Sequence, residues 1–358
     1  MLWIGDYQGM YEGFTQAGLN YLMALKTVGF EDVDVLPLSG LWADRMPPWA
    51  APLLKGDKFG MSREPCIIHT LPTNLPAIRL GGPRRTGFVT FETDRLPKWI
   101  ARELNRVTVS LIVPCEFNHE GLLAAGYKNP IHVVPHTVGR WWWETALEPS
   151  QDRPFTFTYV GTWVPRKNAK AILRAYLDAF PVESEYTCLV LKIVAAAGYK
   201  EQIKALVGDR TDIHVFDEVW SERQVQWLHV NTDCFVSAHK GEGWGLGPFQ
   251  AKLIGRPVIY TDWSAVREFC SPVYGDLPVV CDIYPVEAGM ESMPMYAEPE
   301  GVLHWANPRH EALVEAMRDV QHGFGERTIL AKMAAEGLRN RFCWETVGAN
   351  LRDTISKL

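Results

Sequence analysis

The sequence predicts an α/β protein made of two doubly wound domains. Short apolar, β-branched segments alternate with segments of helical periodicity along the whole chain. Most of them are joined by short turns, which favours parallel sheets covered by helices on both faces. A length of 358 residues suits two such domains better than one. We place the domains at residues 1–150 and 151–340, followed by a last helix in residues 341–358.

The first half opens with a strand, a glycine-containing loop and a helix. Leu2–Ile4 is apolar, the loop runs to Gly13, and apolar residues then recur at helical spacing up to Val28. This order is typical of nucleotide-binding domains, although a flexible turn explains the loop equally well. Later strands are expected at residues 33–36, 66–69, 86–91, 107–113 and 131–134, helices after Pro97 and Glu116, and a long surface loop at 37–65.

Polar side chains follow two strands of the first half, at the point where each strand ends. His69 closes one apolar strand, and Glu92 and Asp94 follow another. Ligand sites of parallel sheets lie beyond the carboxyl ends of the strands. The three side chains therefore predict a site at this edge, although His69 taken alone is equally consistent with a structural role in the core.

The second half repeats the alternation after a predicted linker at residues 136–154. Ser221 and Gln224 have the spacing of a capping box that opens a helix, and Asn307 with Pro308 is expected to cap another. Strands are expected at residues 155–160, 187–194, 213–216, 233–237, 257–260 and 278–281, and helices at 172–180, 199–207, 264–269, 313–320 and 344–355.

One stretch, residues 233–259, organises the second half. A strand ends at Ser237, a glycine-rich loop carries Glu242, and a short apolar helix and a second strand follow. Glycines let a ligand approach the backbone, and the N–H groups that begin a helix can hold phosphate or sugar oxygens. Arg166 and Lys167, on another loop, suit a diphosphate. A solvated cation pair and a carboxylate stabilised by the helix dipole are the structural alternatives.

Composition excludes several other classes of protein. The net charge of −6 gives no general electrostatic footprint for nucleic acid. Seven scattered cysteines without a CxxC pair indicate reduced thiols rather than disulfides or a zinc site. We find neither a signal peptide nor a membrane-spanning run, and expect a cytoplasmic protein, with peripheral membrane attachment as an alternative.

The motifs of the second half resemble those of the group 1 glycosyltransferases, which have the GT-B fold. The resemblance lies in Gly161 with Lys167-Asn168, in Glu242-Gly243-Trp244-Gly245-Leu246 with Gln250, and in Gly255-Arg256-Pro257-Val258-Ile259. It covers most of residues 155–345 and extends more loosely into the first half. It implies two Rossmann-like domains that face each other across a cleft, with the C-terminal helix crossing back to the first domain.

This resemblance implies a retaining transfer of a sugar from a nucleotide-diphosphate sugar to an acceptor hydroxyl, as in hexosyltransferases, with no metal and no cofactor. Glu242 matches the first motif glutamate, and His69 and Glu92 are the catalytic candidates of the first domain. The expected donor-binding residues are Gly13, Gly161, Thr162, Arg166, Lys167, His239, Gly243, Trp244, Gly245, Leu246 and Gln250. The sequence departs from the family at Thr162, where an arginine is usual, and at Gln250, where a second glutamate is usual.

These departures support a second hypothesis, a GT-B-shaped nucleotide-sugar or carbohydrate-binding protein with little or no catalysis. A phosphorylase is a third, but no lysine stands where pyridoxal phosphate would need one. The acceptor stays open among a saccharide, a lipid-linked sugar, a small molecule, a protein and a modified nucleic-acid base. Six basic residues suit either an anionic acceptor groove or a solvated face: Arg79, Arg84, Arg85, Lys98, Arg102 and Arg106.

Overall fold

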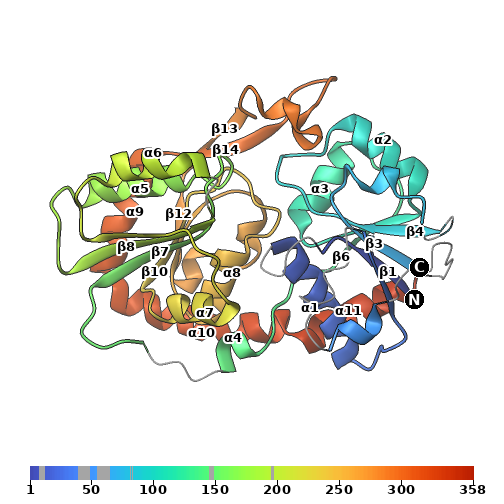
Figure 1. The fold of residues 1–358 in the computed structure, drawn as a ribbon, viewed down its shortest axis with the longest axis horizontal. Coiled ribbons are helices and arrows are strands. Elements are labelled where there is room, and N and C mark those ends of the chain that lie inside the picture. Colours follow the sequence, from blue (N-terminus) through green and yellow to red (C-terminus); the bar gives the residue numbers. More distant parts are fainter. Residues whose placement is uncertain are drawn as a thin grey trace. The chain divides into compact units, whose positions relative to one another are not determined.

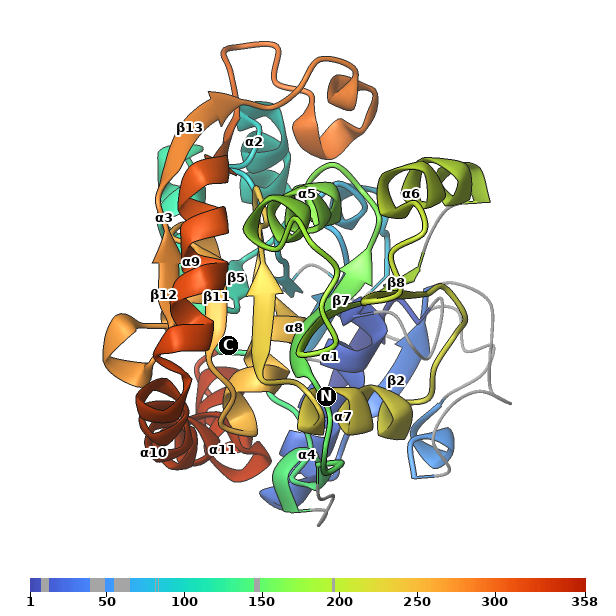
Figure 2. The same cartoon turned by 90° about the vertical axis from the view of Figure 1, so that its left-hand side faces the viewer.

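The computed structural model describes residues 1–7, 13–38, 49–54, 65–80, 82, 84–144, 149–194 and 197–358. The chain forms two compact units (Figures 1 and 2). Unit 1 comprises Met1–Arg140, Pro285–His304 and Asn340–Leu358, and unit 2 comprises Trp141–Tyr284 and Trp305–Arg339. Each unit contains a six-stranded parallel sheet, which confirms the predicted fold class.

The sheet of unit 1 has the strand order β2-β1-β3-β4-β5-β6. Its strands are β1 (Leu2–Gly5), β2 (Asp34–Pro37), β3 (Cys66–His69), β4 (Arg85–Phe88), β5 (Ser110–Val113) and β6 (Ile131–Val133). Helices α1 (Gly13–Thr27) and α11 (Trp344–Ile355) cover one face, and α2 (Lys98–Val107) and α3 (Glu116–Ala124) cover the other. The expected strand at 107–113 begins only at Ser110, because Val107 still belongs to α2.

The last helix joins the first half of the chain, as the resemblance implies. Val347 and Leu351 of α11 are buried against α1 in one apolar cluster. Trp344 Nε1 donates a hydrogen bond of 3.0 Å to Asn20 Oδ1. The two helices approach closely at Gly348, where an added Cβ would lie 2.2 Å from the carbonyl oxygen of Ala24.

This close approach gives a stability prediction. We expect Gly348→Ala to lower the free energy of unfolding by about 1–3 kcal/mol, because the helices must separate to admit the methyl group. Gly337, in α10 (Phe324–Phe342), is the matched control, since an added Cβ there would meet no atom within 4 Å. Gly337→Ala should stabilise by about 0.5–1 kcal/mol through helix propensity. Urea unfolding checks both variants, and equal effects would contradict the packing argument.

The segment Pro285–His304 leaves unit 2 and belongs to unit 1. It lies between β13 (Cys281–Pro285) and β14 (His304–Pro308), which pair with each other. Within unit 1, Arg95 forms an ion pair of 2.5 Å with the buried carboxylate of Glu298, which also accepts a hydrogen bond from the Lys98 amide. Trp99 Nε1 donates to the carbonyl of Ala297 at 2.7 Å. The segment is thereby fixed to the beginning of α2.

The sheet of unit 2 has the strand order β12-β11-β10-β7-β8-β9. Its strands are β7 (Phe155–Thr162), β8 (Thr187–Val194), β9 (Ile213–Phe216), β10 (Cys234–Ser237), β11 (Val258–Thr261) and β12 (Leu277–Val279). Helices α5 (Ala169–Ala179), α6 (Lys200–Val207) and α9 (His310–His322) pack on one face (Figure 1). Helices α7 (Glu222–Val230) and α8 (Leu246–Leu253) pack on the other.

Two helix N-termini of unit 2 are predicted from capping residues, one at Ser221 and one at Asn307. The capping box is confirmed, since the Gln224 amide donates to Ser221 Oγ and the Ser221 amide donates to Gln224 Oε1. The predicted cap at Asn307 is wrong: Asn307 belongs to β14, and α9 begins at His310. The Arg309 amide donates a hydrogen bond to the carbonyl of Val280, so the chain stays extended beyond Asn307 and Pro308 before the helix begins.

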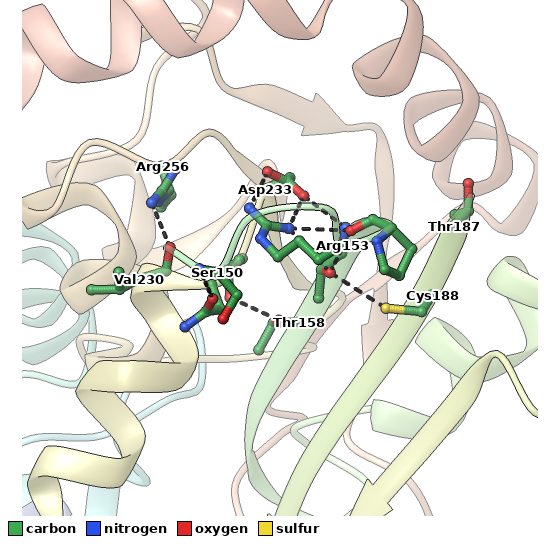
Figure 3. Close-up of polar contacts among 12 residues, drawn as sticks. Ser150, Arg153, Thr158, Thr187, Cys188, Val230, Asp233 and Arg256 are labelled. Carbon is green, nitrogen blue, oxygen red and sulfur yellow. Dashed lines mark hydrogen bonds and ion pairs between the residues drawn. The ribbon is translucent and has the colours of Figure 1, made fainter. Parts of the chain in front are cut away.

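A partly buried ion pair lies at the start of the unit 2 sheet. Arg153, from the predicted linker, forms a bidentate pair with Asp233, with Nη2 2.7 Å from Oδ1 (Figure 3). Asp233 also accepts a hydrogen bond of 2.8 Å from the Thr156 amide. The pair therefore sets the alignment of β7 and β10, and the loops that follow these two strands carry the candidate site.

Candidate active site

Two loops of unit 2 meet at the carboxyl ends of β7 and β10. Gly161 and Thr162, expected in a loop, are the last residues of β7, because they continue the ladder with β8. The Lys240 amide donates a hydrogen bond of 2.8 Å to the carbonyl of Arg166. Arg166 Nη1 donates one of the same length to the carbonyl of Gly241. These reciprocal bonds join the two loops into one surface.

Three predicted residues come together on this surface. Lys167 Nζ lies 2.5 Å from Glu242 Oε1, and Arg166 Nη1 lies 3.5 Å from Glu242 Oε2. The Glu242 residue is only 6% exposed. Burial raises the pKa of Glu242, but the charges of Lys167 and Arg166 outweigh this effect and hold the pKa below its usual value. The carboxylate is therefore ionised at neutral pH, and two cations lie beside it.

His239 is buried beneath the same loops. Its Nδ1 lies 3.0 Å from Ser237 Oγ, and its Nε2 lies 3.2 Å from the carbonyl oxygen of Trp263. Burial lowers the pKa of His239, so the ring is neutral at neutral pH. A carbonyl oxygen can only accept, so the single N–H of the neutral ring is on Nε2. Nδ1 therefore accepts a hydrogen bond from the hydroxyl of Ser237. Both nitrogens are engaged, which makes His239 a support for the loop after β10.

A glycine-rich turn brings the N-terminus of α8 next to Glu242, since a Cβ at Gly245 would lie 3.7 Å from Glu242 Cγ. Gly245, the N-cap, has φ +94°, a conformation that favours glycine. A Cβ at Gly247 would lie 2.8 Å from the Phe235 ring and 3.1 Å from the carbonyl oxygen of Val160. The first turn of α8 thus packs against β7 and β10, and the N–H groups of Leu246 and Gly247 suit an anion, since Pro248 has no N–H.

Some residues predicted around this turn can offer a side chain to a ligand, and others can offer only backbone groups. Trp244 is 3% exposed, and its ring packs against Phe249 and Phe269, so its side chain serves the core and its backbone borders the site. Gly243 likewise offers only backbone. Gln250 is half-buried in α8. Its side-chain amide makes no hydrogen bond to any part of the chain that the structure describes. Thr162 is exposed at the end of β7.

Sequence patterns alone did not reveal two residues that hold the loops in strained conformations. Asn168 (φ +55°) and Ser264 (φ +64°) both have left-handed backbone, which is rare outside glycine. Asn168 Nδ2 donates to the carbonyl of Ala238, and Ser264 Oγ accepts the amide of Glu242 at 3.2 Å. Such strain concentrates at functional sites. A positive φ at a residue other than glycine leaves no reliable mark in a sequence.

Unit 1 holds the other predicted residues. His69 ends β3, is 1% exposed and stacks on Phe14 of α1 with 4.1 Å between ring centroids. Burial, assisted by His136, lowers the pKa of His69 to about 3. Neither ring nitrogen has a hydrogen-bond partner within the described residues. Glu92 is half-buried after β4, and Gly13 is the first residue of α1.

The described residues contain neither a cluster that could hold a metal ion nor a helix that could cross a membrane. No group of three or more His, Cys, Asp or Glu side chains in them is placed to hold a metal ion. None of the helices formed by these residues is both long and apolar enough to cross a membrane.

The two parallel sheets and the loops at their strand ends define the GT-B fold. HepE from Anabaena, in a complex with UDP and glucose, matches with a TM-score of 0.70 and 12% identity over 100% of both chains. Sucrose-phosphate synthase from Thermosynechococcus elongatus matches with a TM-score of 0.67 and 14% identity over 99% of this chain and 98% of its own. A glycosyltransferase from Rickettsia africae gives 0.70 and 13% over 99% and 97%. No family model and no curated protein matches the sequence.

Proposed function

We propose that the protein is a retaining glycosyltransferase that moves a sugar from a nucleotide-diphosphate sugar to an acceptor hydroxyl, without a metal ion. The observation that carries the proposal is the cluster of Lys167, Arg166 and Glu242 beside the N-terminus of α8. The likeness to HepE, whose structures hold UDP, UDP and glucose, or UDP-glucose, supports it. Unit 2 would bind the donor, and unit 1 the acceptor.

The charges of the cluster suit a leaving diphosphate. Lys167, Arg166 and the N–H groups that begin α8 would neutralise its negative charge, as fixed dipoles and cations do in dry sites. Glu242 would accept hydrogen bonds from sugar hydroxyls, and Gln250, one turn into α8, would bond the ribose. The donor therefore has to draw Lys167 away from Glu242, so the ion pair is the resting state of the site.

Retention follows if the acceptor attacks on the face that the diphosphate leaves. The bond between the anomeric carbon and the phosphate oxygen breaks, the acceptor oxygen forms a bond to that carbon, and the acceptor proton passes to the leaving phosphate. No enzymic nucleophile is required in this scheme. His69 and Glu92 would orient the acceptor or the donor from unit 1. The ring of His69 is neutral, because burial lowers its pKa to about 3, and it is only 1% exposed, so a role for it requires the surrounding chain to move.

A panel of nucleotide sugars tests the proposal. We expect at least one of them to raise the melting temperature, by the mass-action stabilisation of about 2.7 kcal/mol that a ligand gives at 100 times its Kd. The same compound should be consumed when the acceptor is found, and NMR of the product should show the anomeric configuration of the donor. Inverted product would contradict the retaining mechanism.

The alternative is a GT-B-shaped binding protein, which Thr162 and Gln250 in place of charged family residues favour. Binding of a nucleotide sugar without turnover across a broad set of acceptors would support it. Failure of every nucleotide and nucleotide sugar to bind would contradict both hypotheses.

Glu242→Gln separates sugar binding from diphosphate binding. Loss of the charged acceptor should lower kcat/KM for transfer about 10–100-fold. The affinity for the nucleoside diphosphate alone should stay equal or rise, because Lys167 is then released from its partner at 2.5 Å. Calorimetry with the diphosphate and a transfer assay check the two effects, and a parallel loss of both would contradict the assignment.

We also propose a cytoplasmic location. All seven cysteines are free, and five of them are buried, namely Cys66, Cys115, Cys188, Cys234 and Cys270. Unpaired thiols are usual in a reducing compartment.

A further inference from the structure

We propose that Lys192 reads the base of the donor nucleotide by donating a hydrogen bond to the carbonyl oxygen at C4 of uracil or at C6 of guanine, so that unit 2 selects uridine or guanosine diphosphates over cytidine or adenosine diphosphates. This inference rests on the proposed function, since it extends the diphosphate site along the sheet. It assigns a specificity role to a buried lysine that lies beside a small apolar cluster of the sheet.

Lys192 lies on the strand next to the diphosphate site. It pairs with Val160 of β7 on one side and with Phe216 of β9 on the other. The carbonyl of Val160 is the group that the first turn of α8 approaches at Gly247. Neighbouring strands are about 4.8 Å apart, so β9 lies about 10 Å from β7. If a nucleotide binds across the strand ends with its phosphates at α8, its base therefore lies over β8 and β9.

The side chain of Lys192 is directed to the face of the sheet that α7 and α8 cover. Residues that pair in register share a face, and Val160 and Phe216 pack there with Trp220 in one small apolar cluster. Lys192 is only 4% exposed. Its Nζ lies 5.5 Å from the centroid of the Trp220 ring, which is half-buried.

The ammonium group is poorly satisfied in this position. In the part of the chain that the structure describes, its only hydrogen bond is a long one, 3.5 Å, to the carbonyl of Ile193. An ammonium has three donors, and leaving them unmet inside a protein is costly. Burial lowers the pKa of Lys192, while the charges of Glu218 and Asp217 act in the opposite direction. An acceptor supplied by a ligand would complete the site.

The chemistry of the two groups specifies the ligand. The half-buried Trp220 ring offers a face on which a base can stack. An ammonium donates hydrogen bonds and accepts none, so it matches O4 of uracil or O6 of guanine. Cytosine and adenine carry an amino group at the corresponding ring position and would place a donor against a donor. The site therefore distinguishes oxo bases from amino bases.

Calorimetry with UDP, GDP, CDP, ADP and inorganic pyrophosphate tests this inference. The wild type should bind UDP or GDP about tenfold more tightly than CDP and ADP, the effect of one hydrogen bond to a charged donor. Lys192→Met should remove this preference and leave pyrophosphate binding unchanged. Lys192→Gln, whose amide both donates and accepts, should also lose the preference, and serves if the methionine variant does not fold.

Lys204→Met is the matched control, because Lys204 is an exposed lysine of the neighbouring helix α6. It should bind all five compounds as the wild type does. Equal binding of the four nucleotides by the wild type, or a preference that survives in both Lys192 variants, would overturn the inference and leave the proposed function standing. Failure of all nucleotides and nucleotide sugars to bind would overturn both.

Discussion

Lys167→Met is expected to weaken binding of the donor nucleotide by one to two orders of magnitude without unfolding the protein. The substitution removes a charge-assisted contact with the diphosphate, which contributes about 1.5–3 kcal/mol. Arg166 remains 3.5 Å from Glu242 and still neutralises part of its charge. Lys167 is itself half-buried at the edge of unit 2, so a methionine can occupy its place with little loss of packing.

Calorimetry with the nucleoside diphosphate measures the loss, and a melting curve shows whether the fold is kept. Lys170→Met is the matched control, because Lys170 is an exposed lysine in the first turn of α5, three residues further along the chain. It should bind the diphosphate as the wild type does. Equal losses in both variants would mean that general electrostatics, and not a specific contact, attracts the ligand.

Lys252→Met is expected to lower the stability of unit 2 by about 3–5 kcal/mol, the usual effect of leaving a buried charge without its partner. Lys252 and Asp276 are 2.8 Å apart, and both side chains are fully buried. Asp276 also accepts the amides of Val258 and Ser271. The pair therefore ties α8, which begins at the candidate site, to the start of β11.

The loss should depend on pH in a defined direction. Burial raises the pKa of Asp276 to about 6 even beside Lys252, and without that lysine the pKa rises further. A carboxyl whose pKa is higher in the folded state than in the unfolded chain favours folding only while it is protonated. The deficit of Lys252→Met should therefore be small near pH 4 and grow as the pH rises towards 8.

Urea unfolding at several pH values measures this dependence. Lys252→Met/Asp276→Asn is the informative second variant, because it removes both charges and keeps an oxygen for the backbone amides. It should recover much of the lost stability at pH 8. A deficit that is the same at all pH values would contradict the role given to Asp276.

Local and periodic features of this fold could be predicted from the sequence, whereas contacts between distant single residues could not. The capping box at Ser221 depends on neighbours three residues apart, and α11 presents a regular apolar face, so both predictions succeeded. Glu298 is held by Arg95 and the Lys98 amide, about two hundred residues earlier, and no periodicity marks such a pair. The helix α10 was missed because Ile329 and Met333 are apolar but exposed, so the buried face of Ala331, Ala335 and Leu338 does not stand out in the sequence.

The candidate site likewise has residues that the sequence predicts and contacts that it does not. The resemblance to glycosyltransferase motifs selected Lys167 and Glu242, and the adjacent Arg166 was added as a second charge; all three lie together in the structure. It could not show that the Trp244 ring turns into the core, or that Ser264 holds the amide of Glu242. Side-chain direction depends on tertiary packing, which a motif does not record.

The helix pair α1 and α11 has a consequence for how the protein is made. The side of α1 that carries Ala24, together with Val28 just after the helix, is covered by α11, near the end of the chain. At typical rates of synthesis the ribosome needs about 10–40 s to pass from residue 140 to residue 351. During that interval the nascent first unit exposes a hydrophobic surface that only the last residues can close. Ribosome-bound chains that stop before α11 should therefore recruit chaperones that recognise unfolded apolar segments.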